Sequence, residues 1–155
     1  MDPLIEVAAV IAAIHLAAPW VPREDRARYA ADIAATAPNL VTAKAMIATA
    51  TVESGFRPAI ERCECKKHEC DAGLAVSIYQ LHKYHFAGHT PAEICASNRL
   101  ASELAGRTLW WLSQHLGGMT EALRVYVGTF VSPNDPRVKP RLEIFERLMQ
   151  VHPDV

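Results

Sequence analysis

One glutamate, Glu53, has the position that a catalytic carboxyl group needs. It continues an apolar stripe formed by Ala43, Met46 and Ala50, in the last turn of a predicted helix that begins near Asn39. Partial burial and the negative end of a helix both favour the neutral form of a carboxyl group. A carboxyl group that keeps its proton near neutral pH can protonate a leaving oxygen, as the general acid of a glycosidase does. The alternative is a solvated glutamate at a frayed helix end.

The second chemical feature is a cluster of cysteines in a polar segment at 56–73, where the helical period is lost. Four potential zinc ligands stand within eight residues, namely Cys63, Cys65, His68 and Cys70. Their spacing, C-x-C-x2-H-x-C, differs from that of the usual zinc knuckle, and Cys95 offers a partner for a disulfide instead. Three states therefore stay open: at least one disulfide involving Cys95, a zinc site, or free thiols. The sequence indicates no other cofactor.

Two further groups of side chains have weaker chemical signals. His82, His85 and His89 would share one face of a helix, so they could bind a metal, although solvated histidines are the default. Trp110 and Trp111 are adjacent, so both cannot face the core of one regular helix. We expect one of them inside and the other at the surface, where an indole could stack on a sugar ring.

These residues must be positioned by helices, because helical periodicity dominates the chain. A capping box at Thr90 and Glu93 marks the start of one helix, and Gly55 provides a left-handed residue at the end of another. The segment 74–81 fits either a short strand or a buried helical turn. The predicted helices cover 3–18, 22–36, 39–54, 90–117 (as one helix or a kinked pair), 119–127 and 136–151.

Length and composition predict one all-α domain with a very small β element. The chain has 155 residues, half of them apolar, with 16 basic and 17 acidic groups and a net charge of −1. Such a charge argues against a nucleic-acid partner, and no apolar run is long enough for a membrane span. We divide the domain into N-terminal helices (1–38), a core (39–130) and a C-terminal helix (136–151).

The N-terminal segment from Leu4 to Trp20 is apolar enough to suggest a secretory signal. Asp2 and Glu6 stand where a signal carries basic residues, and His15 interrupts the apolar run. We therefore expect a buried first helix rather than a cleaved leader.

Three segments, in this order, resemble the lysozyme-like superfamily of lytic transglycosylases and goose-type lysozymes. In that superfamily Glu-Ser ends the catalytic helix, an Ala-x-Gly-Leu-Met-Gln-like segment lines the cleft, and an Ala-Tyr-Asn-x-Gly-like segment closes it. The corresponding segments here are Glu53-Ser54-Gly55-Phe56, 75–81 (AVSIYQL) and Val125-Tyr126-Val127-Gly128. Residues 79–85 (YQLHKYH) also look like the goose-type stretch Met-Gln-Val-Asp-Lys-Arg-Tyr-His with one residue fewer.

The resemblance implies cleavage of the β-1,4 bond between N-acetylmuramic acid and N-acetylglucosamine, with Glu53 as general acid and later base. It places Gln80 in the saccharide cleft, where an amide both donates and accepts hydrogen bonds, and Tyr126 beside the catalytic carboxyl group. It makes Tyr79, Ser77 and His82 further candidate saccharide-binding residues, and Tyr79 replaces a methionine of the cleft segment. Two more positions in or beside that segment depart from the pattern: Ser77 replaces a glycine and His82 replaces an aspartate. Val127 likewise replaces the asparagine after the tyrosine.

The second carboxylate decides the type of reaction. An inverting lysozyme needs a base that positions water, and Asp71 lies in the loop from which goose-type enzymes supply this acid. Glu61, Glu64 and Glu69 are alternatives on the same loop, and an Asx turn before Gly73 is the structural explanation of Asp71. A lytic transglycosylase needs one carboxyl group only, because the muramyl 6-hydroxyl attacks in place of water. Asp71 favours hydrolysis slightly.

The resemblance also implies partners and a place of action. The partner is the peptidoglycan glycan strand, and a single domain without a leader fits a phage-derived enzyme. Such a protein is made in the cytoplasm and acts on the cell wall after lysis or injection, as an endolysin or as a virion component beside tail proteins. A non-catalytic module of the same fold is the rival interpretation, and a small zinc protein is the third.

Overall fold

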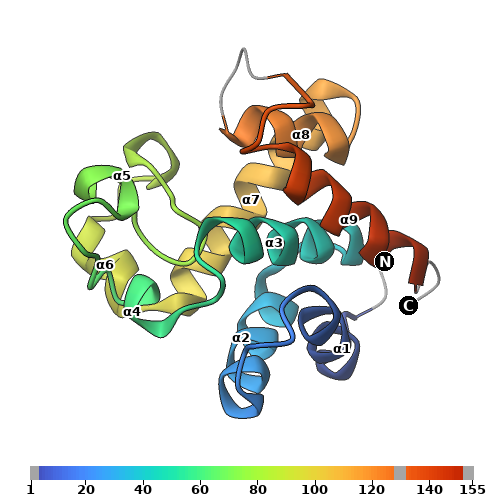
Figure 1. The fold of residues 1–155 in the computed structure, drawn as a ribbon, viewed down its shortest axis with the longest axis horizontal. Helices are drawn as coiled ribbons and strands as arrows, with labels where there is room; N and C mark the ends of the chain where they lie inside the picture. Colours follow the sequence, from blue (N-terminus) through green and yellow to red (C-terminus); the bar gives the residue numbers. More distant parts are fainter. Residues whose placement is uncertain (1–3, 128–131, 152–155) are drawn as a thin grey trace.

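The computed structural model describes residues 4–127 and 132–151, and its helices surround one central helix, α3 (Figure 1). The long helices are α1 (Val7–Ala17), α2 (Arg23–Thr36), α3 (Leu40–Glu53), α7 (Asn98–Leu116), α8 (Met119–Val127) and α9 (Lys139–Val151). The short elements are α4 (Pro58–Glu61), α5 (Cys70–Gly73), the 3₁₀ helix η1 (Lys83–His85) and α6 (Pro91–Ala96).

Helix α3 is central because it is apolar or uncharged around almost its whole circumference. Every residue from Thr42 to Thr51 is buried, and α3 packs against α1, α2, α7, α8 and α9. The Asn39 side chain accepts a hydrogen bond from the Thr42 amide at 2.8 Å and caps the start of the helix. A helix with no polar face of its own needs partners on all sides, so the other helices are arranged around it.

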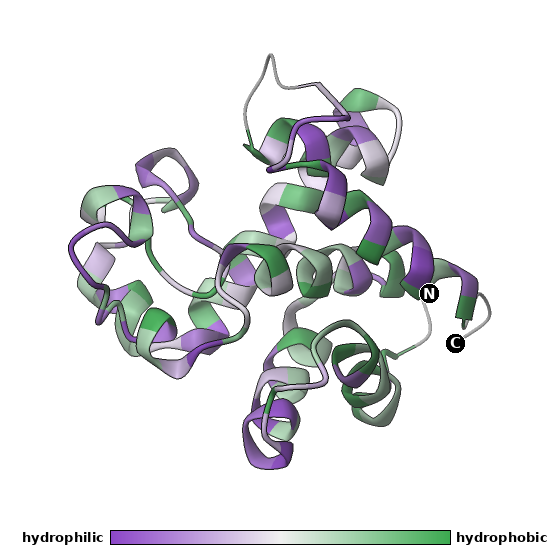
Figure 2. Cartoon of the chain, in the orientation of Figure 1, coloured by the Kyte–Doolittle hydropathy of each residue, from purple (hydrophilic) through white to green (hydrophobic). Residues whose placement is uncertain are grey.

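The packing partners of α3 differ in polarity (Figure 2). Helix α1 is mostly hydrophobic, and its Val10, Ile14 and Ala17 are buried. Helix α2 begins with hydrophilic turns that extend away from the core. Where α7 packs on α3, Gly106 lies so close to Met46 that an added Cβ would be 3.2 Å from its sulfur atom. The missing side chain thus lets the two helices approach closely.

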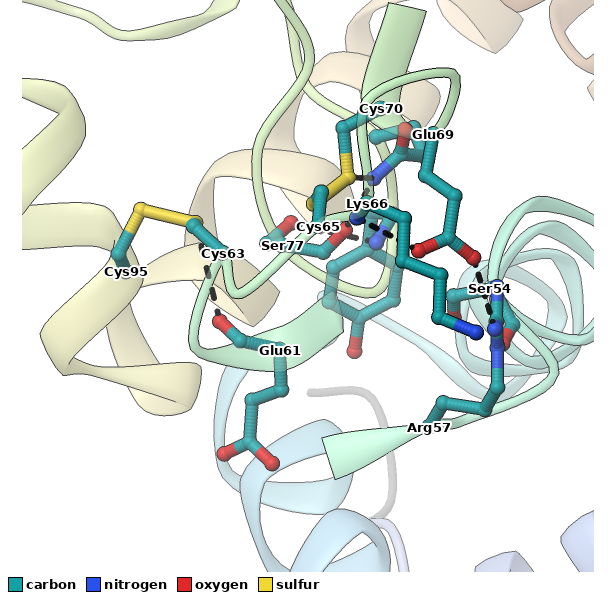
Figure 3. Close-up of a disulfide and its surroundings, with 12 residues drawn as sticks. Ser54, Arg57, Glu61, Cys63, Cys65, Lys66, Glu69, Cys70, Ser77 and Cys95 are labelled. Atoms are coloured by element: carbon teal, nitrogen blue, oxygen red, sulfur yellow. Dashed lines mark hydrogen bonds and ion pairs between the residues drawn. A yellow bond between two sulfur atoms is a disulfide. The ribbon is translucent and has the colours of Figure 1, made fainter. Parts of the chain in front are cut away.

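The polar segment at 56–73 contains one internal disulfide and is joined to α6 by a second (Figure 3). Cys63 bonds to Cys95 of α6, and Cys65 bonds to Cys70. Of the three states that the sequence left open, the structure therefore has the disulfide involving Cys95. The zinc set of Cys63, Cys65, His68 and Cys70 is wrong, because its three sulfur ligands are consumed in disulfides. In the described ranges, no cluster of three His, Cys, Asp or Glu side chains could hold a metal ion, so the histidine trio forms no site.

The two disulfides are expected to stabilise the fold unequally. The Cys63–Cys95 bond closes a loop of 32 residues and the Cys65–Cys70 bond a loop of 5. Because loop-closure entropy grows with loop length, replacing Cys63 and Cys95 by Ser should lower the free energy of unfolding by about 3 to 4 kcal/mol. The matched pair Cys65→Ser/Cys70→Ser should lose about 2 kcal/mol. Urea unfolding without reductant measures both, and equal or reversed losses would contradict the prediction.

The structure confirms one all-α domain and most of the predicted helix positions. The first helix begins at Val7 rather than at residue 3, which lies outside the described residues. The predicted helix at 90–117 is a pair, α6 and α7, separated by Ser97, whose side chain caps α7. The segment 74–81 is a tight turn closed by an isolated bridge between Val76 and Leu81, not a strand. No described helix is both long enough and apolar enough to cross a membrane.

Candidate active site

Glu53 is held by an arginine that the sequence analysis did not identify. Arg141, in the first turn of α9, donates from Nη2 to Oε1 of Glu53 across 88 residues of sequence. The side chain of Arg141 is 1% exposed and that of Glu53 is 25% exposed. Atoms Nε and Nη1 of Arg141 are buried without an acceptor among the described residues. Glu53 is thus the partner on which this buried cation depends, and the Glu53 side chain is still partly exposed.

Tyr126 of α8 is the third member of this group. Its hydroxyl donates a hydrogen bond of 2.8 Å to the carbonyl oxygen of Tyr79, and the Arg141 guanidinium lies 5.8 Å from its ring centroid. Burial, and then the negative charge of Glu53, raise the pKa of Tyr126 well above its usual value. We call Glu53, Arg141 and Tyr126 the Glu53 cluster; it joins the ends or first turns of α3, α8 and α9. The predicted position of Tyr126 beside Glu53 agrees with this geometry.

Gln80 lies in the turn at 76–81 that Tyr126 contacts through the Tyr79 carbonyl. Its backbone is left-handed, with φ 52°, and its side chain is half-buried. Nε2 donates to the Ser77 carbonyl oxygen at 2.9 Å and lies 3.5 Å from the Cys70 sulfur. These contacts hold the amide in place at the edge of the turn.

The prediction that Tyr79 and Ser77 line the saccharide cleft is wrong. Tyr79 is fully buried, and its hydroxyl shares a 2.7 Å hydrogen bond with buried Ser102. Ser77 is also buried, and its hydroxyl accepts from the Tyr79 amide at 3.2 Å. The positive φ of Ser77 and of Gln80 turns the chain so that Tyr79 enters the core. Neither side chain can touch a saccharide; their role is to shape the turn that carries Gln80.

The acidic side chains of the 56–73 segment differ in their hydrogen-bond and ion-pair partners. Glu61 accepts hydrogen bonds from Arg28 and Tyr29, whereas Glu64 pairs with Arg62 and Glu69 with Arg57. The Asp71 side chain is 65% exposed, and its Oδ2 lies 3.8 Å from Nε2 of His82. The structure therefore brings the predicted residues Asp71 and His82 together, and Asp71 is not engaged by an arginine in any described contact.

His85 links the Glu53 cluster to a neighbouring pocket. Its ring stacks on that of Tyr126 at a centroid distance of 5.4 Å. Burial, and then the proximity of His82, lower the pKa of His85 to about 4. Its Nδ1 accepts a hydrogen bond from the His82 amide at 3.3 Å. His85 is therefore a neutral ring near pH 7, with its proton on Nε2.

A pocket of about 650 Å³ opens beside Tyr126, between η1, α7 and α8. Both Trp110 and Trp111 line it and both are exposed, by 41% and 54%. The expectation that one indole packs in the core is wrong, because Leu104, Ala105 and Leu109 occupy the core face of α7. The wall also includes Tyr84, His85, Arg107, Thr108, Val125 and Tyr126. The sequence analysis did not identify Arg107 or Tyr84 as pocket residues. For Arg107 the available signal was its position about one helical turn before Trp110 and Trp111 on α7.

Glu53 is thus a partly exposed carboxylate, and Tyr126 of its cluster lines an aromatic pocket. Gln80 lies in the turn that Tyr126 contacts, and Asp71 lies in the segment before that turn. Gly128, the last residue of the third similar segment, lies outside the described residues. The chain matches no family model, no curated protein and no solved structure.

Proposed function

We propose that the protein is a glycosidase of the lysozyme-like class that cleaves peptidoglycan between N-acetylmuramic acid and N-acetylglucosamine. One observation carries the proposal: a single partly exposed carboxylate, Glu53, is fixed by a buried arginine beside an aromatic pocket large enough for a small ligand. The resemblance of the three segments described above supports the same activity.

Each member of the Glu53 cluster has a role in this proposal. Arg141 holds Oε1 of Glu53, which leaves Oε2 as the oxygen that faces a glycosidic bond. In its protonated form Glu53 gives a proton to the leaving 4-oxygen of N-acetylglucosamine, and the resulting carboxylate, paired with Arg141, then takes a proton from the attacking group. Tyr126 keeps its proton and directs it to the Tyr79 carbonyl, so it is a positioning residue and not an acid. Gln80 offers its amide oxygen to the saccharide.

Water is the attacking group if Asp71 acts as the base. Transfer to the muramyl 6-hydroxyl, with a 1,6-anhydro product, is the second candidate. The high exposure of Asp71, with His82 as its described neighbour, favours this second reaction, because a water-positioning base has to be held in place. The two reactions share Glu53 and differ in the acceptor.

Mass spectrometry of digested muropeptides tests both reactions. Hydrolysis gives reducing muramyl ends, whereas the intramolecular reaction gives products lighter by one water. If Asp71 is the base, Asp71→Asn should lower the hydrolytic rate by about a hundredfold or more. The control is Glu24→Gln, an exposed acid of α2 that lies outside this segment, which should leave the rate unchanged. An unaffected Asp71→Asn enzyme with anhydro products would assign the transglycosylase reaction.

A non-catalytic module remains the rival proposal, because an ion pair between α3 and α9 also has a purely structural use. A zymogram with purified peptidoglycan separates the two: a clear zone supports the enzyme, and its absence supports the module. We keep the phage origin, as endolysin or virion component, within the proposal.

A further inference from the structure

The pocket beside the Glu53 cluster has a chemistry that catalysis by Glu53 does not explain. Among its described lining residues there is one permanent cation, Arg107, and there is no carboxylate. Arg107 is exposed, and no described carboxylate lies within ion-pair distance of it. A pocket with this wall is complementary to an anion that also presents a face for aromatic stacking.

Two aromatic side chains of the wall, Trp111 and Tyr84, have ring contacts of their own. The Trp111 ring stacks on that of His115 at a centroid distance of 4.0 Å. On the opposite wall Tyr84 lies between His82 and His85, at 5.9 Å and 4.5 Å. Arg107, Trp110 and Trp111 are three and four residues apart on α7, so they share one face of the helix. Rings that are already ordered lose little entropy when a ligand stacks on them.

We infer that this pocket binds the peptide-bearing muramyl unit of the glycan, with Arg107 pairing with a carboxylate of the stem peptide and Trp110 and Trp111 stacking on the sugar. The inference rests on the proposed function, because it takes the glycan strand as the ligand. Tyr126, a member of the Glu53 cluster, also lines the pocket. A muramyl unit in the pocket would therefore place its glycosidic bond near Glu53. The protein would then distinguish peptidoglycan from peptide-free strands of similar sugars.

Binding of two disaccharides tests this inference without any bond cleavage. The probes are N-acetylglucosaminyl-N-acetylmuramic acid with its stem tetrapeptide and the same disaccharide without peptide, with its lactyl carboxyl group converted to the neutral amide so that it carries no carboxylate. Neither contains the bond that the enzyme is proposed to cut. The indoles of Trp110 and Trp111 report binding through their fluorescence.

The expected result is tighter binding of the peptide-bearing disaccharide by the wild-type protein. Arg107→Gln should weaken that binding about tenfold, the low end for a hydrogen bond to a charged group, and should leave binding of the peptide-free disaccharide unchanged. Arg23→Gln, an exposed arginine at the start of α2 away from the pocket wall, is the matched control and should change neither affinity. The advantage of the peptide-bearing probe should shrink as salt is added.

Equal binding of the two disaccharides, or equal weakening of both by Arg107→Gln, would overturn the inference. Cleavage of whole peptidoglycan is measured separately. If the wild-type protein cleaves the polymer but does not discriminate between the disaccharides, this inference alone fails. If it discriminates but cleaves nothing, the pocket assignment stands and the glycosidase proposal fails.

Discussion

Glu53→Gln is expected to reduce the rate of peptidoglycan cleavage at least about a thousandfold, because general acid–base catalysis contributes factors of this size. The glutamine keeps the shape of the side chain and can still accept a hydrogen bond from Arg141. What it loses is the ability of the side chain to give and take a proton. Release of soluble muropeptides from purified peptidoglycan measures the rate.

The matched control for this variant is Glu143→Gln. Glu143 is an exposed glutamate of α9 that pairs with Lys139, two residues from Arg141 in sequence. Its replacement should leave the rate within twofold of the wild-type value, an order-of-magnitude bound for a surface ion pair. Retained activity in Glu53→Gln would remove Glu53 from its catalytic role, and with it the proposed function.

The same substitution should lower the free energy of unfolding by about 3 kcal/mol. From the sequence alone, Glu53 is a half-buried glutamate at a helix end, and removal of its charge would leave the free energy of unfolding unchanged or raise it. The ion pair reverses the sign of this expected change, because Arg141 is 1% exposed and Glu53 supplies its one described acceptor. Without the carboxylate, a buried guanidinium has no counter-charge.

A second substitution distinguishes this cause from general damage at the site. Arg141→Met added to Glu53→Gln replaces the buried cation by an apolar chain and should recover most of the lost stability, while activity stays absent. Urea unfolding of the wild type, both single variants and the double variant gives the coupling energy. A double variant less stable than Glu53→Gln alone would contradict the proposed cause.

These two results together describe a site in which one ion pair serves both stability and chemistry. Arg141 joins α9 to the end of α3, and Tyr126 joins α8 to the turn at 76–81. The carboxyl group of Glu53, the proposed proton donor, is therefore immobilised by the contact with Arg141 that holds the C-terminal helix in place. Precise placement of a reactive group is worth a large part of a catalytic rate enhancement.

Much of the secondary structure could be predicted because its causes are local. Asn39 caps α3, Gly55 follows it in a left-handed conformation, and Thr90 accepts a hydrogen bond from the Glu93 amide. These interactions involve neighbours along the chain, as does the apolar stripe that identified Glu53. The sequence offered Cys95 as a disulfide partner but did not decide among a disulfide, a zinc site and free thiols, because a disulfide depends on where two distant segments meet.

What the sequence alone determined is therefore the helical domain, the candidate carboxylate and the irregular polar segment at 56–73. The tertiary structure alone decided which groups surround that carboxylate. Arg141 reaches Glu53 from 88 residues away, Tyr79 turns into the core although its neighbour Gln80 does not, and both indoles of α7 lie on the pocket. Periodicity reports which face of an element is apolar, but contacts between faces depend on how whole helices pack, and that is a property of the assembled core.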